Sequence, residues 1–245
     1  MANTTLGNLK IGALRRAANS YNSGDASALV QAGGIINDVL TEIQAETRDS
    51  LYWKDLNNSV NTTANQAYVD LVDTDILEIL SVFQATTKKK LTRINRRDYV
   101  SIYPDTSVSA GIPDIAYDEE QIISVAGVNT FRLFLMPTPA SAIAILYDYL
   151  KNARFSADGT SADGEYCALP STYDNLIYAM FKAKWFGIID SENSGRIAAA
   201  QAQADNAKRI YYAMLRTKSD EHFQAGSRRD NRNRPYWNVK ATPTP

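Results

Sequence analysis

The chain has 245 residues, of which 44% are hydrophobic and 22% are charged, and its formal net charge is −1. A chain of this length can bury a full core and form one or two domains. A net charge near zero argues against a protein that binds nucleic acid over its whole surface, so any basic function must be local. The single cysteine, Cys167, excludes an intrachain disulfide, and the single histidine, His222, removes most zinc sites and catalytic triads.

No targeting or membrane segment is predicted. The first residues, Met1 to Asn8, lack the basic and apolar regions of a signal peptide, and the longest apolar runs are far too short to span a bilayer. We therefore expect a soluble protein that is made in the cytoplasm and has no membrane partner.

Two helices are predicted near the start of the chain, because apolar residues recur there at helical spacing. The first covers about residues 6–17, and the second carries an apolar stripe over residues 27–43. Asp25 or Ser27 is available as the N-cap of the second helix. The pair Gly33–Gly34 lies inside that helix and predicts that another part of the backbone packs closely there.

The middle of the chain is predicted to hold strands. The sequence NQAYVDLVDTDILEILSVFQ reads as a short strand, an acidic turn and a second strand, and a further strand lies around residues 121–125. Residues 131–151, FRLFLMPTPASAIAILYDYLK, predict a hairpin of two apolar strands folded about Pro137 and Pro139, which cannot donate to a ladder. Residues 88–97 combine basic side chains with apolar positions at helical spacing, which predicts a short amphipathic helix.

The last third of the chain is predicted to be helical. After a loop at residues 154–170, a helix over residues 171–190 is apolar on most sides, so Trp185 is predicted to be a core residue. From Ile197 onward, apolar residues recur with heptad spacing on a long helix that ends near Thr217. The segment that follows has almost no aliphatic residues and cannot fold by itself.

These elements together predict a mainly α-helical fold with a β insertion. A helical bundle core spans residues 1–220, and a small antiparallel β region is inserted in it at about residues 52–150. An extended C-terminal tail spans residues 221–245. No internal repeat of the solenoid type is present.

No catalytic, cofactor or metal site is predicted. Carboxylates occur in pairs only on predicted turns and element ends, where solvated residues are expected. Cys167 lies at a loop-to-helix junction and is expected to be a packing residue, and His222 adjoins the tail, where no scaffold orients it. Neither a phosphate-binding P-loop nor a dinucleotide-binding fingerprint is present. The paired carboxylates are Asp73 with Asp75, residues 118–120, and Asp220 with Glu221.

Two candidate contact surfaces are predicted instead. The first, the basic segment, is in its simplest interpretation a solvated helix face, but it can also line a path for DNA or meet an acidic partner. The second, the C-terminal tail, combines arginine with aromatic residues, the types enriched at the hot spots of protein interfaces. The basic segment carries Lys88, Lys89, Lys90, Arg93, Arg96 and Arg97. The tail carries Phe223, Arg228, Arg229, Arg232, Arg234, Tyr236 and Trp237.

The chain contains, in this order, TLGNLKIGALRRA, ALVQAGGIINDVLTEIQAE, NQAYVDLVDTDILEILSVFQ, IPDIAYDEE, FRLFLMPTPASAIAILYDYLK and LPSTYDNLIYAMFKAKWFGIIDS. The order and spacing of these segments resemble the head-to-tail adaptor family of tailed bacteriophages, also called head completion or packaged-DNA stabilisation proteins. The likeness covers most of residues 6–215. The chain departs from the simplest family pattern in its long loop at residues 154–170 and in its basic, aromatic tail.

The resemblance implies a non-enzymatic structural protein of the virion. It implies a ring of about twelve copies, mounted under the portal after DNA packaging, with genomic DNA passing through its channel. The helical part would form a collar, the tail would grip the portal protein, and the β part would face neighbouring copies or a tail nozzle or tail tube protein. The strand edges of the predicted hairpin would then be covered by the next copy or by the tail.

Two other functions stay open from the residues alone. A nucleic-acid-binding module that uses residues 88–97 and the arginines of the tail would bind in a strongly salt-dependent way, unlike an interface anchored by aromatic residues. A cell-wall hydrolase with Glu119 or Glu165 as its acid lacks a paired carboxylate in a predicted cleft.

Overall fold

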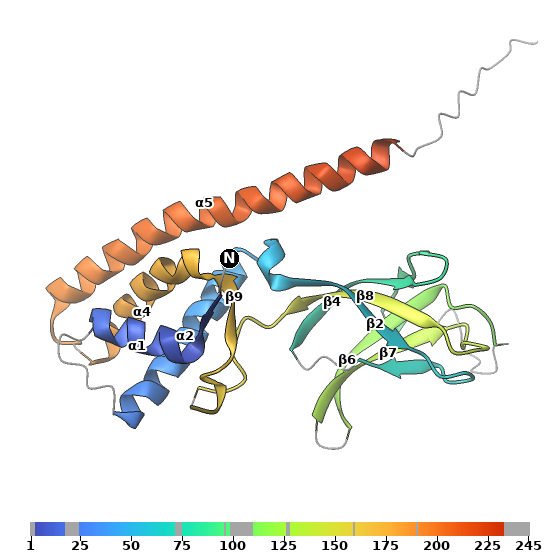
Figure 1. Ribbon diagram of the computed structural model, residues 1–245, viewed down its shortest axis with the longest axis horizontal. Helices are drawn as coiled ribbons and strands as arrows, with labels where there is room; N and C mark the ends of the chain where they lie inside the picture. The colour runs from blue at the N-terminus through green and yellow to red at the C-terminus, as the bar shows by residue number, and fades with distance from the viewer. Residues whose placement is uncertain are drawn as a thin grey trace, which may run out of the picture.

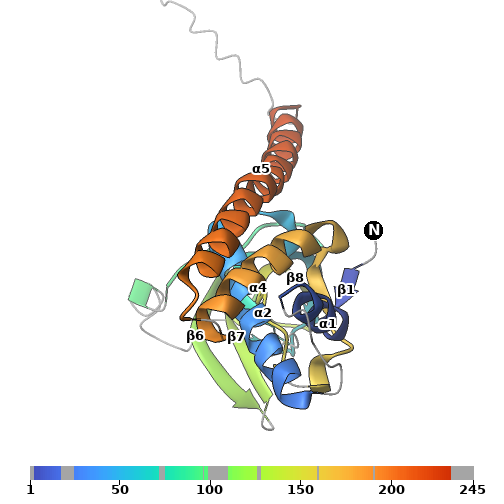
Figure 2. The same cartoon turned by 90° about the vertical axis from the view of Figure 1, so that its left-hand side faces the viewer.

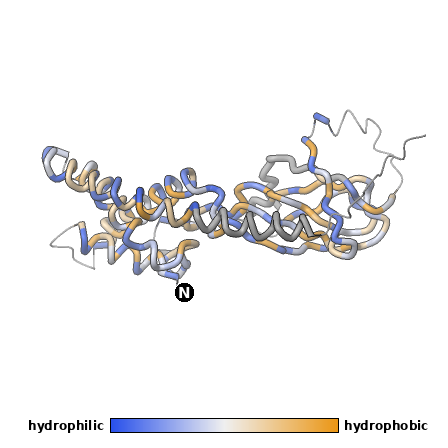
Figure 3. Tube along the Cα trace, turned by 90° about the horizontal axis from the view of Figure 1, so that it is seen from above, coloured by the Kyte–Doolittle hydropathy of each residue, from blue (hydrophilic) through white to orange (hydrophobic). Residues whose placement is uncertain are grey.

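A computed structural model describes residues 3–17, 25–71, 75–95, 97–98, 110–125, 128–158, 160–189 and 191–232, with the backbone alone at residues 115, 117–125, 128–130, 160 and 217–232. The chain forms two lobes that lie end to end along the long axis of the molecule (Figures 1 and 3). One lobe is helical and the other is a β-sandwich, and each has its own buried apolar cluster. The expectation of a mainly α-helical fold is therefore wrong, because the fold is a mixture of α and β structure.

The helical lobe is built around helix α4 (Asp174–Ile189), which contacts the other three described helices of the lobe (Figure 2). Its apolar residues face the core on most sides, and Trp185 is 8% exposed and stacks on Phe181, as predicted. The other helices are α1 (Leu6–Ala17), α2 (Ala26–Glu46) and α5 (Ser194–Arg232), and the small sheet of the lobe pairs β1 (Asn3–Thr5) with β9 (Tyr166–Pro170). Asp25 caps α2, its side chain accepting a hydrogen bond from the N–H of Ala28, which confirms one of the two predicted caps.

Helix α5 continues to Arg232, well past its predicted end near Thr217. Leu215 is fully buried at the end of the heptad pattern, and the side chains from residue 217 onward lie outside the described residues. Apolar periodicity reports which residues of a helix are covered, and it does not report where the helix ends. The sequence after Thr217 contains no proline before Pro235, so nothing in it breaks the backbone hydrogen bonding earlier.

The β-sandwich packs two sheets face to face, with strand orders β2-β8-β4 and β3-β7-β6-β5. Side chains from both sheets form its core, among them Ile79, Tyr147 and Leu133. The first sheet contains β2 (Lys54–Asn61), β8 (Ala144–Lys151) and β4 (Ile76–Gln84). The second contains β3 (Tyr68–Asp70), β7 (Val128–Met136), β6 (Ile115–Val125) and β5 (Thr92–Arg93). Short 3₁₀ helices lie at Leu51–Trp53, Thr160–Ala162 and Ser171–Tyr173.

The predicted hairpin over residues 131–151 is wrong in its pairing. The two apolar strands exist as β7 and β8, but they belong to different sheets, and the chain crosses from one sheet to the other through Pro137 and Pro139. Each is an inner strand, because β7 lies between β3 and β6 and β8 lies between β2 and β4. Their edges are thus covered within one chain, and no neighbouring copy is needed to cover them.

The first sheet has one outer strand that the sequence predicted, β4, and one that it did not, β2. Strand β2 has the sequence KDLNNSVN, and its polar side chains and the positive φ of Asn57 suit an edge strand that faces solvent. On the other side of the sheet, residues 89–91 bind the end of β4, through the N–H of Gln84 to the oxygen of Lys89 and the N–H of Leu91 to the oxygen of Val82. The same segment then continues into β5 of the second sheet.

The basic segment is therefore not the predicted amphipathic helix. Leu91 is buried in the core of the sandwich, and only Arg97 and Asp98 have helical backbone in the described part of this segment. The spacing of Leu91 and Ile94 fits one helical turn, but the backbone of residues 89–93 forms strand hydrogen bonds instead. Long-range pairing with β4 and β6 overrides the local pattern here.

A return segment, residues 151–158, leads the chain from the sandwich back to the helical lobe along α2. Gln44 donates to the backbone oxygen of Lys151 at 2.6 Å and accepts from the N–H of Ala153 at 3.2 Å. Two turns earlier on α2, Asn37 accepts from the N–H of Phe155 at 2.8 Å and donates to the carboxylate of Asp158 at 2.5 Å. Both amide side chains are almost fully buried and satisfy backbone groups that would otherwise lack partners.

The close approach predicted at Gly33–Gly34 is confirmed for Gly33. A Cβ atom on Gly33 would overlap the backbone oxygen of Asp158 and lie 2.8 Å from the Cε of Lys10. A Cβ atom on Gly34 would lie 3.7 Å from the Asp158 carboxylate, an ordinary contact. The return segment therefore lies against the backbone of α2 at Gly33 and not at Gly34.

We predict opposite effects for alanine at these two neighbouring glycines. Gly33→Ala should lower the free energy of unfolding by about 1–3 kcal/mol, because the new methyl group must displace the return segment. Gly34→Ala should leave it unchanged or raise it by up to about 1 kcal/mol, because alanine favours the helix. Urea denaturation of both variants measures the difference, and equal stability of the two would contradict the packing of residue 158 on α2.

Candidate functional site

The candidate site is the surface of the helical lobe on which helix α5 packs, called the seat below. The seat sets the position from which the C-terminal part of the chain leaves the lobe. Helix α5 crosses over α4 and α2 and then extends beyond the lobe (Figure 1). From Arg216 to its end at Arg232 the helix rises by about 24 Å, at 1.5 Å per residue. The backbone of this projecting part carries Phe223, Arg228, Arg229 and Arg232. Three predicted tail residues, Arg234, Tyr236 and Trp237, lie outside the described residues.

Along α5, the apolar contacts with the lobe are made first by small residues and further along the helix by aromatic residues. Ala200 and Ala204 are buried against α4, and Leu215 is fully buried at the far end of the seat. Between them, Tyr211 packs on Tyr173 with ring centroids 5.8 Å apart. Tyr173 in turn meets Tyr52 at 5.6 Å in an edge-to-face arrangement, so aromatic rings from three segments meet beneath α5.

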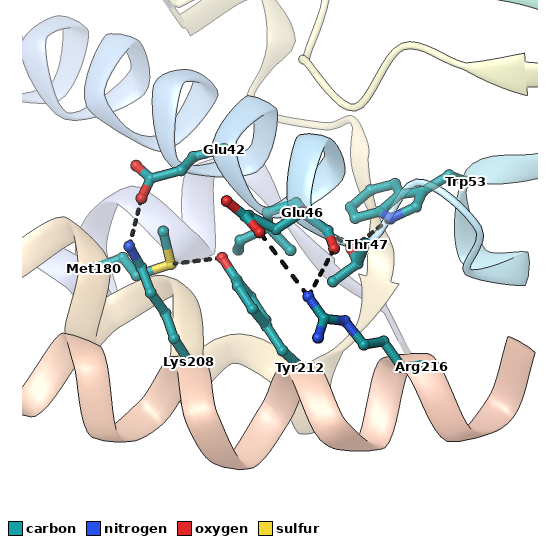
Figure 4. Close-up of polar contacts among 9 residues, drawn as sticks. Glu42, Glu46, Thr47, Trp53, Met180, Lys208, Tyr212 and Arg216 are labelled. Carbon is teal, nitrogen blue, oxygen red and sulfur yellow. Dashed lines mark hydrogen bonds and ion pairs between the residues drawn. The ribbon is translucent and has the colours of Figure 1, made fainter.

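The polar part of the seat centres on Glu42 of α2. One carboxylate oxygen of Glu42 lies 2.5 Å from the Nζ of Lys208 on α5, and the other lies 3.0 Å from the Nζ of Lys184 on α4. Figure 4 shows Glu42 above Lys208, with the phenol of Tyr212 beside them. One partly buried carboxylate thus joins three helices, and both of its oxygens are paired.

A second contact closes the seat where α5 leaves the lobe. The guanidinium of Arg216 lies 4.0 Å from the Glu46 carboxylate and 3.5 Å from the Glu46 backbone oxygen, at the end of α2 (Figure 4). The end of α2 is itself held in place, because the indole N–H of Trp53 donates to Thr47 at 3.0 Å. Arg216 and Glu46 are largely exposed, so this ion pair is weaker than the one at Glu42.

The titration behaviour of the seat follows from these contacts. Partial burial acts to raise the pKa of Glu42, but the hydrogen bonds and charges of Lys208 and Lys184 outweigh it, so the pKa lies below its ordinary value. Burial raises the pKa of the Tyr212 phenol, and the negative charges of Glu42 and Glu46 raise it further. Tyr212 therefore stays neutral, with its hydroxyl 4.0 Å from the sulfur of Met180.

The basic segment is divided in the structure. Lys88, Lys89 and Lys90 are exposed on the turn that follows β4, at the end of the sandwich far from the helical lobe. Arg93 turns back along the sheet and donates to the backbone oxygen of Ile79, near the middle of β4. Arg97 is exposed, and Arg96 lies outside the described residues. The structure thus brings the three lysines together and separates Arg93 from them.

The residues considered for chemistry have structural surroundings where they are described. Burial raises the pKa of the Cys167 thiol to about 12, as fits a packing residue. The carboxylate of Glu165 accepts hydrogen bonds from the backbone and the side chain of Ser156 and so fixes the adjoining loop. The side chains of Glu119 and His222 lie outside the described residues. Among the described residues, no three His, Cys, Asp or Glu side chains gather in a way that could hold a metal ion.

An open groove of about 910 Å³ lies beside the return segment and β9. Two of its carboxylates serve internal contacts, since Asp158 binds Asn37 and Asp75 accepts from the hydroxyl of Tyr149 at 3.0 Å. The first contact holds the return segment on α2, and the second lies within the sandwich, between β8 and the residue that precedes β4.

Sequence reasoning missed Glu42, Lys184 and Lys208. They lie on three helices that are far apart in the chain, so no local pattern in the sequence connects them. The available signal was that Lys208 lies next to Ala207, on the edge of the apolar stripe of α5, where a long side chain can reach a neighbouring helix.

We predict that Glu42 stabilises the protein in a pH-dependent way. A carboxyl group with a lowered pKa contributes stability that is present above pH 4.5, its ordinary value, and is lost as the pH falls through the lowered pKa. Glu42→Gln should lower the free energy of unfolding by about 1 kcal/mol at pH 7, and this gap should shrink below pH 4.5. Urea denaturation across this range measures the gap, with exposed Glu192→Gln as the control. A gap that does not change with pH would contradict the ionic role.

A comparison with models of protein families identifies the family of this chain. The model of the SU10 adaptor protein family matches residues 4–235, nearly the whole chain, including the seat and the projecting part of α5. The comparison with curated proteins finds no match. No helix in the described part of the chain is long and apolar enough to cross a membrane. The chain therefore belongs to the SU10 adaptor protein family, a family of structural head-tail adaptors of bacteriophages.

Proposed function

We propose that the protein forms a ring of copies beneath the portal and joins the DNA-filled head to the tail. Membership of the adaptor family makes the protein a phage adaptor and a virion component. The observation that carries the finer proposal is that α5 leaves its lobe as a helix and leads directly into the arginine-rich, aromatic tail. Such a projecting segment suits insertion into a partner.

In this proposal the C-terminal part of the chain binds the portal protein. Residues 221–232 of this part belong to α5 and not to the extended tail that the sequence predicted, so they would bind as a preformed helix and lose less backbone freedom than a segment that folds on binding. Phe223, Tyr236 and Trp237 offer large apolar surface, and the tail arginines offer paired hydrogen bonds to carboxylates. Repetition around a ring of about twelve copies would add many modest contacts into a durable joint.

The two lobes would then serve different neighbours. The helical lobe, from which α5 emerges, would form the collar next to the portal. The sandwich extends away from that lobe and would contact neighbouring copies and a tail nozzle or tail tube protein (Figure 1). Genomic DNA would pass through the central channel without sequence-specific contacts, and the lysines at 88–90 would meet either this DNA or an acidic partner. In functional terms residues 1–220 act as the core, and residues 221–245 act as the anchor.

The alternative of a nucleic-acid-binding module has less support. It requires a continuous basic surface along residues 88–97, but Arg93 is turned toward Ile79 and is separated from the three exposed lysines. Neutralising several phosphates would make binding fall steeply with salt concentration. An aromatic-anchored protein joint would depend on salt far less.

We predict that the chain ending at Asp220 folds but does not attach to heads. The truncation keeps the whole seat, including Tyr212 and Leu215, so its thermal unfolding should match that of the full chain. Co-sedimentation with portal-containing, DNA-filled capsids measures attachment. The full-length variant with Lys88, Lys89 and Lys90 all changed to Gln is the control and should attach. Normal attachment by the truncated chain would rule out the tail as the main anchor.

We also predict that attachment of the full chain to capsids resists salt. The joint should survive 0.5 M NaCl, a concentration at which the screening length falls to about 4 Å, because its aromatic contacts are not screened. The same sedimentation assay, repeated over a salt series, measures this. Release that follows the steep logarithmic salt dependence of phosphate binding would favour the nucleic-acid alternative instead.

A further inference from the structure

Large buried side chains, Tyr212 and Leu215, hold α5 at the far end of its seat, whereas small side chains leave its rotation less well fixed along the stretch before them. Between Ile197 and Tyr211, the side chains that α5 turns toward the lobe are Ala200, Ala204 and Ala207. Helices choose a crossing geometry by fitting large side chains into grooves, and alanine provides only a shallow ridge. A row of alanines permits close approach in more than one register at similar apolar burial.

Glu42 restricts the rotation of α5 about its own axis. Its two oxygens take one lysine each from α4 and α5, at 3.0 Å and 2.5 Å, so the pairing is satisfied in one arrangement of the three helices. Moving α5 by one residue turns it by about 100° and takes Lys208 out of reach. The neighbours of Lys208 are Ala207, which has no charge to replace it, and Arg209, which contacts Asn206 on the exposed side. A partly buried polar group that specifies register is a known use of such groups.

Because α5 is long, a small change in its direction at Lys208 causes a large displacement of its C-terminal end. From Lys208 to Arg232, α5 extends by about 36 Å, so a tilt of about 10° at Lys208 would move its end by about 6 Å. A displacement of that size is larger than the tolerance of a packed interface. The direction of α5 therefore matters for any partner that receives its end.

We propose that Glu42 is a positioning residue for portal binding, which sets the rotation and direction of α5 through Lys208 and Lys184. This inference rests on the proposed function, because it assumes that the C-terminal part of the chain binds the portal. Glu42 touches no partner itself, and it acts by presenting α5 in one orientation.

The positioning role can be tested on the isolated full chain by spin labelling. Labels at Asp38→Cys on α2 and Met214→Cys on α5 occupy exposed positions, and the buried Cys167, with its raised pKa, does not compete for the reagent. The parent should give one narrow distance distribution. Met214 lies about 9 Å along α5 from Lys208, so Glu42→Lys should broaden the distribution or shift its mean by about 2 Å. The charge exchange Glu42→Lys with Lys208→Glu and Lys184→Glu restores both ion pairs and should narrow it again. Glu192→Gln, which removes an exposed carboxylate outside the seat, is the control and should leave the distribution narrow.

A second experiment measures attachment to capsids. It distinguishes a failure of the positioning role from a failure of the proposed function. In the capsid co-sedimentation assay, Glu42→Lys should lose attachment while thermal unfolding remains cooperative, and the charge exchange should restore attachment. An unchanged distance distribution in Glu42→Lys would overturn the positioning role whatever the portal does. If the chain ending at Asp220 fails to attach but Glu42→Lys attaches normally, tail binding stands and the positioning proposal falls. If the truncated chain attaches normally, the proposed function itself falls.

Discussion

The hydrogen bonds between α2 and the return segment hold the two halves of this molecule in one arrangement. Asn37 and Gln44 lie two turns apart on one face of α2, and between them they bind three backbone groups and one carboxylate. The opposite side of the same helix carries Glu42, which binds the lysines of α4 and α5. A single central helix therefore connects the sandwich, through the return segment, to the helix that leaves the lobe at the other side.

This arrangement separates the rigid parts of the protein from the parts that face partners. The two apolar clusters are each complete within one chain, and the inner strands β7 and β8 have both edges covered. The described part of one chain therefore contains both of these cores and covers both edges of its two central strands.

The sequence predicted the helices of this fold well and its sheets poorly, for a physical reason. Helices α1, α2 and α4 depend on contacts within a few residues, so their apolar periodicity and the cap at Asp25 are visible in the sequence. Strand pairing depends on distant residues, so the segment 131–151 looked like a hairpin although its halves join different sheets.

The residues of the candidate site also divide into those that a local sequence pattern indicated and those that no local pattern indicated. The tail was visible because arginine and aromatic residues without aliphatic neighbours form a local pattern, whereas Glu42 and Lys208 meet across 166 positions and leave no local pattern. The basic segment shows the opposite error, since a local pattern at Leu91 and Ile94 was overridden by pairing with β4.

The two crossings between the lobes lie side by side, and this has an evolutionary consequence. Lys54, where the chain enters the sandwich, is paired across the ladder with Leu150, where it leaves. The sandwich is thus joined to the helical lobe through neighbouring residues, as an insert that a short connection could replace. Within a family of phage adaptors, such an insert can change while the helical lobe keeps its own buried core.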